Sequence, residues 1–177
     1  MATTKWSIDS MHSEIGFKVK HMMISNVNGS FAAFTADAVT DGDDFSTAQI
    51  NFSAKVDSIT TGVADRDAHL KSDDFFNAET YPEISFKGNG LIKKSDEQYA
   101  LTGDLTIRDI TKPVTLDVDY AGIVTDPYGQ VKAGFALHGK VKRSEYNLKW
   151  NAITEAGSIV VSDDIKIAAE VQLIKQA

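Results

Sequence analysis

The sequence predicts an all-β protein, folded as an antiparallel up-and-down β-barrel of about eight strands. Apolar and polar residues alternate with a period of two along most of the 177 residues, which is typical of strands that bury one face. Helical periodicity is nearly absent, and short turn-like segments separate the alternating stretches. A two-layer antiparallel sandwich would produce the same pattern and remains the alternative architecture.

The first strands are predicted near the N-terminus. Ile15, Phe17 and Val19 share one face of the first clear strand, and a second strand begins after a turn at residues 25–26. The alternation then changes phase after Ala33, which indicates a bulge or a bend in the chain.

Six more strands follow, separated in one place by a different pattern. They are predicted over residues 50–56, 84–91, 98–107, 114–120, 133–137 and 165–173. Residues 62–76 break the alternation, and their composition suits a short helical insert. Within the insert, Asp73 and Asp74 are expected to cap a turn, and Phe75 and Phe76 to close one end of the barrel.

Composition excludes several classes of protein. The chain has no internal repeat or linker, so a single domain is expected over residues 1–177. It has no cysteine, which excludes disulfides and cysteine nucleophiles. The net charge of −7 argues against a nucleic-acid partner, because phosphate contacts need clustered lysines and arginines. No apolar run approaches the roughly 20 residues of a spanning helix, so no stable membrane insertion is expected.

The N-terminus carries neither the charged region nor the apolar run of a secretion signal. We therefore expect a cytoplasmic protein. A periplasmic location follows instead if a signal peptide was removed.

The interior of an eight-stranded barrel is either filled by its own side chains or holds one small ligand. Small residues on the predicted inward faces favour a cavity: Ala33, Ala54, Gly88, Gly103, Gly122, Ala133 and Ala169. Glycines in strands also permit bends, so a packed barrel remains open. A cavity walled by Phe, Ile, Leu and Val favours a long apolar ligand, because each buried methylene contributes about 0.8 kcal/mol.

A series of motifs lies at residues 6–9, 12–22, 25–31, 57–61, 66–76, 81–86, 103–107 and 111–114. From about Trp6 to Leu173, in order and spacing, these motifs resemble those of the YceI-like family. One block departs from the family pattern, with Glu145, Tyr146 and Asn147 where the family has Asp, Phe and Gly. Asparagine tolerates a left-handed backbone nearly as glycine does, so the turn should survive.

The resemblance implies a lipocalin-like barrel that binds polyisoprenoids or other long amphiphiles, often as a dimer. We therefore expect a homodimer that sequesters or carries an isoprenoid quinone, a polyprenyl chain or a fatty-acid-like amphiphile. The alternatives are a cavity enzyme that acts on an apolar substrate and a stress-response protein with a packed barrel. No cofactor is expected other than a bound lipid.

The candidate ligand-binding residues combine inward apolar side chains with polar residues of the insert. They are Phe17, Val19, His21, Phe31, Phe52, Arg66, Asp67, His69, Phe75, Phe86, Leu105, Leu116, Phe135 and Trp150. Arg66 either meets the polar head of a ligand or pairs with a carboxylate and fastens the insert to the barrel. Trp6 and Trp150 either line the pocket or plug its base.

No catalytic or metal-binding residues are predicted. The sequence has no Gly-x-Ser-x-Gly nucleophile motif. The spacing of His12, His21 and His69 matches no standard zinc pattern. We therefore expect a binding protein rather than an enzyme.

Overall fold

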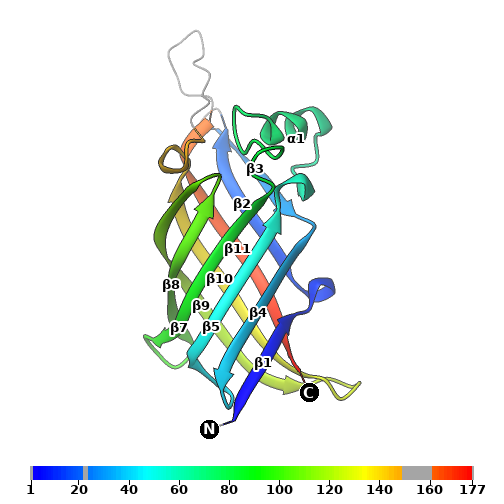
Figure 1. Ribbon diagram of the computed structural model, residues 1–177, viewed down its shortest axis with the longest axis vertical. Coiled ribbons are helices and arrows are strands. Elements are labelled where there is room, and N and C mark those ends of the chain that lie inside the picture. The colour runs from blue at the N-terminus through cyan, green and yellow to red at the C-terminus, as the bar shows by residue number, and fades with distance from the viewer. Residues whose placement is uncertain (1, 22–23, 149–160, 177) are drawn as a thin grey trace.

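Eight antiparallel strands close a barrel in this computed structural model, which describes residues 2–21, 24–148 and 161–176 (Figure 1). Neighbouring strands follow one another along the chain, and β11 pairs with β1 to close the ring. In order around the barrel they are β1 (Thr3–Ile8), β4 (Phe34–Asp41), β5 (Asp44–Lys55), β7 (Glu83–Lys93), β8 (Gln98–Ile107), β9 (Ile110–Thr125), β10 (Val131–Lys142) and β11 (Val161–Lys175). The predicted up-and-down barrel is confirmed.

Three further strands extend the wall at one end: β2 (Glu14–His21), β3 (Ser25–Phe31) and β6 (Ile59–Thr60). The short 3-10 helix η1 (Ser10–His12) separates β1 from β2, and both strands pair with β11 at different heights. β3 likewise continues into β4 after a break at residues 32–33. The change of phase predicted after Ala33 is therefore confirmed as a break between two strands.

The helix α1 (Ala64–Lys71) lies over one end of the barrel, and the two chain termini lie at the opposite end (Figure 1). It follows η2 (Val56–Ser58) and β6, in agreement with the predicted helical insert. A last 3-10 helix, η3 (Arg143–Tyr146), follows β10 near the α1 end. The barrel therefore has an α1 end and a terminal end.

Aromatic side chains fill the terminal end. The ring of Trp6 lies 4.9 Å from that of Phe45, and Phe45 lies 5.0 Å from Phe135. Tyr120 stacks on Phe135 at 5.1 Å. The indole nitrogen of Trp6 donates a hydrogen bond of 3.0 Å to the hydroxyl of Thr40, so its polar atom is satisfied although it is buried. Trp6 therefore belongs to this aromatic plug.

Only some of the small residues predicted to face inward have the predicted role. Ala54 and Ala169 do line the interior, but Ala33 is exposed on the surface. A Cβ atom at Gly103 would lie 2.5 Å from Cζ of Phe86, and one at Gly88 would lie 2.9 Å from the same ring. These two glycines therefore make room for the Phe86 ring against the wall. They do not themselves create empty space.

Candidate ligand-binding site

Two apolar hollows lie inside the barrel among the described residues, and the larger of these two is at the α1 end. This outer chamber has a volume of about 310 Å³. Strand residues form most of its wall, and residues of α1 and the following turn close it on one side. Its lining residues are Ile15, Gly16, Phe17, Val19, Val27, Phe31, Phe52, Ala54, Arg66, His69, Leu70, Phe75, Phe76, Ile84, Leu105, Ile107, Val141, Arg143, Leu148, Ile165 and Ile167.

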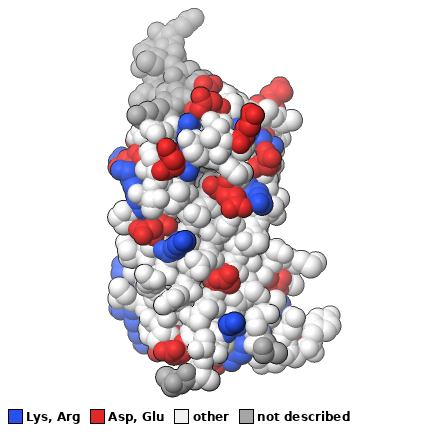
Figure 2. All heavy atoms as spheres, viewed as in Figure 1, with Lys and Arg blue, Asp and Glu red and all other residues white. Residues whose placement is uncertain are grey.

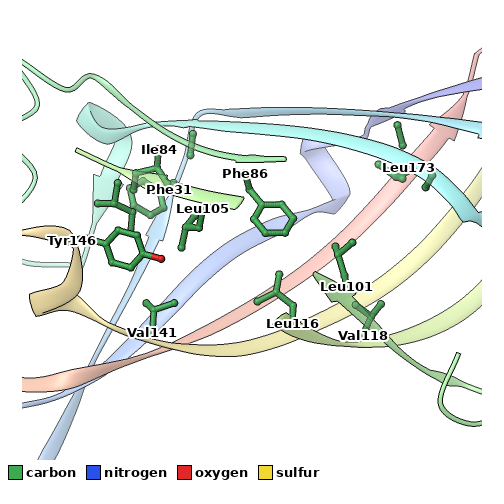
Figure 3. Packing of buried hydrophobic residues seen from close by; sticks show 14 of the residues in the cluster. Phe31, Ile84, Phe86, Leu101, Leu105, Leu116, Val118, Val141, Tyr146 and Leu173 are labelled. Atoms are coloured by element: carbon green, nitrogen blue, oxygen red, sulfur yellow. The ribbon is translucent and has the colours of Figure 1, made fainter. Parts of the chain in front are cut away.

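The second hollow, the inner chamber, lies between the outer chamber and the aromatic plug. Its volume is about 150 Å³, and all its lining residues except Asp37 are apolar. Figure 3 shows part of this buried packing, with Phe86, Leu101, Leu116 and Val118 directed into the barrel. The period-two alternation produces both chambers, because it directs one face of each strand inward.

Arg66 lines the outer chamber, but it does not form the carboxylate pair that was one of its predicted roles. Its Nε donates to Oγ1 of Thr61 at 2.7 Å, and its Nη2 donates to the carbonyl of Thr61 at 2.8 Å. Asp67 instead accepts hydrogen bonds from the backbone N–H and the hydroxyl of Thr61, at 2.8 and 2.6 Å. Thr61 therefore stands between the two charges and fixes the orientation of both.

A different arginine, Arg108 in the β8–β9 turn, fastens the insert to the barrel. Its Nη1 donates to the carbonyls of Phe75 and Asp73 at 2.7 and 3.0 Å, and its Nη2 contacts a carboxylate oxygen of Asp73 at 3.0 Å. The guanidinium also lies over the ring of Tyr81, 5.3 Å from its centre. Sequence reasoning missed this residue, because its partners lie more than 30 positions away.

His69 connects α1 to the turn that follows it. Its Nε2 lies 2.8 Å from a carboxylate oxygen of Asp74, and its ring lies 5.1 Å from that of Phe75 in an edge-on arrangement. Phe75 is buried and Phe76 is half-buried, and both line the outer chamber. The prediction that the two phenylalanines close one end of the barrel is confirmed.

Arg143 is the most deeply buried charged residue in the described part of the chain, with 5% of its surface exposed. Its Nε donates to the carbonyl of Ser162 at 2.9 Å and its Nη1 to that of Leu148 at 2.7 Å. Burial lowers the pKa of its guanidinium. Arg143 thus joins η3 to the start of β11 at the edge of the outer chamber.

Tyr146 is buried beside it, and burial raises the pKa of its hydroxyl. Figure 3 shows this hydroxyl pointing into the barrel. Asn147 follows with a left-handed backbone, φ +62°, as expected from its place in the family turn. Arg143 lines the outer chamber, whereas Tyr146 is part of the buried core and lines neither chamber. Sequence reasoning did not select Arg143 as a site residue, although it lies in the block that departs from the family pattern.

Most of the predicted site residues line one or both chambers. Phe17, Val19, Phe31, Arg66, His69 and Phe75 line the outer chamber, Phe86, Leu116 and Phe135 line the inner chamber, and Phe52 and Leu105 line both. Asp67 does not line either chamber, because its carboxylate is turned toward Thr61. The side chain of His21 and the whole of Trp150 lie outside the described residues. Contact with a ligand stays a prediction for all of these positions.

Among the residues that the structure describes, no three His, Asp or Glu side chains are grouped as metal ligands. None of the helices within the described ranges is long and apolar enough to cross a membrane. On the face shown in Figure 2, acidic and basic side chains are interspersed rather than gathered by sign.

The chain is similar to several known proteins along most of its length. It shares 38% identity over 148 residues with a UPF0312 protein of Photorhabdus laumondii, covering 84% of this chain and 77% of the relative. The solved YceI protein of Campylobacter jejuni is 34% identical, with a TM-score of 0.76 and 96% of each chain covered.

The fold also matches a polyisoprenoid-binding domain of Saccharophagus degradans, with 14% identity, a TM-score of 0.66 and coverage of 97% of this chain and 98% of that one. The YceI-like domain family matches residues 6–173. Coverage of nearly the whole barrel, together with the relatives above 30% identity, shows that this chain belongs to the YceI-like family.

Proposed function

We propose that this protein binds one long apolar molecule inside its barrel and sequesters or carries it. The observation that carries the proposal is the pair of chambers, of about 310 and 150 Å³, enclosed by a closed barrel and walled almost entirely by apolar side chains. Ligand pockets commonly measure about 300–1,000 Å³ and are lined by hydrophobic residues, so the outer chamber is large enough for part of a ligand. The chambers also argue against the packed-barrel alternative.

The proposed ligand is an isoprenoid quinone, a polyprenyl chain or a fatty-acid-like amphiphile. Its apolar chain is favoured because each methylene removed from water contributes about 0.8 kcal/mol. The Saccharophagus domain with the same fold is described as polyisoprenoid-binding, which supports the isoprenoid members of this group. The polar end of the ligand is expected at the α1 end, where Arg66 and His69 supply hydrogen-bonding groups.

The test begins with the lipid that accompanies the protein. Native mass spectrometry of gently purified protein, followed by organic extraction, should show one bound lipid per barrel. Ile165→Trp places extra volume in the outer chamber, whereas Lys166→Trp adds the same ring on the exposed face of the same strand. We expect Ile165→Trp to lose the lipid and Lys166→Trp to keep it. A wild-type protein that yields no lipid and binds no hydrophobic probe would refute the proposal.

The homodimer, the cytoplasmic location, the stress-response role and the absence of catalysis stay predictions. Light scattering of the purified protein measures its oligomeric state directly. The single domain over residues 1–177 is also a prediction, and one cooperative unfolding transition is its expected signature.

A further inference from the structure

The two chambers meet at a ring of four side chains. Ile15 of β2, Phe52 of β5, Leu105 of β8 and Ile167 of β11 line both chambers. β2 and β11 are paired neighbours, whereas β5 and β8 lie elsewhere around the barrel, so the ring, which we call the waist, borders the path from one chamber to the other on three sides. We propose that the waist and the inner chamber limit the length of the apolar chain that the protein accepts. This inference rests on the proposed function.

The inner chamber is suited to the end of an apolar chain. Its one charged lining residue, Asp37, is exposed, and its carboxylate accepts a hydrogen bond of 3.5 Å from the side chain of Asn51. A polar ligand group inside this chamber would lose its contact with water without gaining a partner, which is costly. The head of an amphiphile therefore stays in the outer chamber, and its tail is the part that passes the waist.

The inner chamber ends at the aromatic plug. Phe45 and Phe135 belong both to the chamber wall and to the plug, where they pack on Trp6 and Tyr120. Trp6 is only 1% exposed, and protein interiors of this kind are packed too closely to yield to a further methylene without strain. The plug therefore stops a tail that has filled the inner chamber.

Two glycines keep the path open just beyond the waist. The ring of Phe86 lies over Gly103 and Gly88, in space that any larger side chain at Gly103 would occupy. Because of this, the ring rests against the barrel wall although Phe86 points inward (Figure 3). The two glycines therefore keep the path between the chambers open indirectly, because they let the ring of Phe86 lie against the wall.

The expected signature is a dependence of affinity on chain length that rises and then stops. While a growing tail advances into the inner chamber, each added methylene should raise affinity about fourfold. Once the tail reaches the plug, further methylenes should add nothing or weaken binding. The chain length at which the curve breaks measures the combined depth of the two chambers.

The experiment uses delipidated full-length protein and straight-chain primary alcohols from octanol to hexadecanol, which displace a neutral fluorescent probe. Ala169→Phe fills the inner chamber, and Ala168→Phe adds the same ring on the exposed face one residue earlier. For Ala169→Phe we expect octanol binding within about twofold of wild type and hexadecanol binding weakened more than tenfold. If the new ring displaces only two methylenes of the alcohol, and each contributes about fourfold to affinity, the loss of affinity already exceeds tenfold. Ala168→Phe should follow the wild-type curve.

Two further variants separate loss of the passage from loss of folding. Leu116→Ala enlarges the inner chamber and should move the break to longer alcohols. Ala36→Leu narrows the chamber from β4 and should move it to shorter ones, which repeats the test if Ala169→Phe does not fold. The inference would be overturned if wild-type protein binds the alcohols but the plot of affinity against chain length is unshifted in folded Ala169→Phe, or in both Leu116→Ala and Ala36→Leu. The proposed function would still stand in that case. A wild-type protein that binds no alcohol and no probe would instead refute the proposed function itself.

Discussion

The backbone conformation of Asn147 matters for the stability of the turn after η3. It ends η3 with φ +62°, a conformation that costs most L-residues roughly 1–2 kcal/mol but suits glycine and, less well, asparagine. Its backbone N–H contacts the carbonyls of Arg143 and Ser144, so the turn closes on the residue that holds the edge of the outer chamber. The family's glycine at this place is explained by the same geometry.

We therefore expect Asn147→Ala to lower the free energy of unfolding by about 1 kcal/mol, because alanine lacks the local hydrogen bonding that helps asparagine adopt this conformation. Asn147→Gly should be neutral or slightly stabilising. Urea unfolding followed by circular dichroism measures both. Equal destabilisation by alanine and glycine would show that the side chain of Asn147, rather than its backbone angle, is what matters.

The aromatic plug gives a second prediction at the residue scale. Trp6 is 1% exposed, so Trp6→Ala should lower the free energy of unfolding by about 3–5 kcal/mol through the cavity that it leaves. It should also leave the hydroxyl of Thr40 without the indole donor. Trp6→Phe keeps much of the packing and is the milder control. A loss below about 1 kcal/mol for Trp6→Ala would mean that the terminal end is loosely packed.

At the scale of elements, one side chain holds the helical insert against the barrel. Arg108→Met removes the hydrogen bonds to Asp73 and Phe75 and the contact with Tyr81. It also removes Nε of Arg108, a buried donor without a partner among the described residues, which offsets part of the loss. The expected net loss is about 1–2 kcal/mol in unfolding free energy.

The same substitution should speed ligand release, because α1 and its following turn close the outer chamber. Stopped-flow displacement of a bound fluorescent probe measures the rate of release. Lys55→Met, which breaks the exposed pair with Glu83, is the control and should change neither stability nor release appreciably. An Arg108→Met variant with unchanged release would mean that ligand does not leave past the insert.

Lys132 connects three elements near the terminal end. It lies 2.9 Å from a carboxylate oxygen of Asp9, which caps η1, and 3.4 Å from one of Asp126 in the β9–β10 turn. The hydrogen bond from Lys132, with help from His12, lowers the pKa of Asp9. Backbone N–H groups of Gln130 and Tyr128, together with Lys132, lower the pKa of Asp126.

Carboxylates with lowered pKa values stabilise the folded state at neutral pH and lose that contribution as the pH falls through their folded pKa values. The melting temperature should therefore fall as the pH drops below about 4. Lys132→Met should lower the melting temperature at neutral pH and flatten its acid-side slope, as calorimetry across this range would show. Lys94→Met, which removes a 3.8 Å pair between exposed side chains, should leave the slope unchanged.

The elements were predictable where their signal is local. Residues 98–107 alternate without interruption and form β8 over the same range. The phase change near Ala33 and the left-handed Asn147 could also be read from the chain, because each depends on neighbouring residues. Arg108 could not be predicted, since its partners reach it only after β7 and β8 have paired.

At the scale of the whole molecule, the sequence predicted a hollow but gave the wrong physical origin for part of it. It attributed the space to small inward residues, whereas Gly88 and Gly103 are covered by Phe86. It could not foresee that the hollow divides in two, because the waist is formed by residues from four strands far apart in the chain. The depth of the hollow and its division into two chambers depend on which side chains meet across the barrel. The alternation of residues within one strand carries no information about those contacts.

A hollow protein should also depend on its occupant for stability. A ligand present at about 100 times its dissociation constant adds about 2.7 kcal/mol to the folded state. Delipidated protein should therefore melt at a lower temperature and recover on addition of hexadecanol. Recovery should be weaker in Ile165→Trp, and differential scanning fluorimetry would detect the difference. Identical melting with and without alcohol would show that the alcohol does not bind the native barrel.

The pairing of β1 with β11 has a consequence for biosynthesis. The seam joins Trp6 to Lys175, and a side-chain hydrogen bond across it connects Ser7 with Gln176, 169 positions later. A nascent chain that has emerged only as far as β10 is therefore an open sheet with exposed edges, which invite aggregation. Such long-range closure is also slow. Under the proposed function, a ligand can be loaded only after the last strand has been translated and has docked against the first.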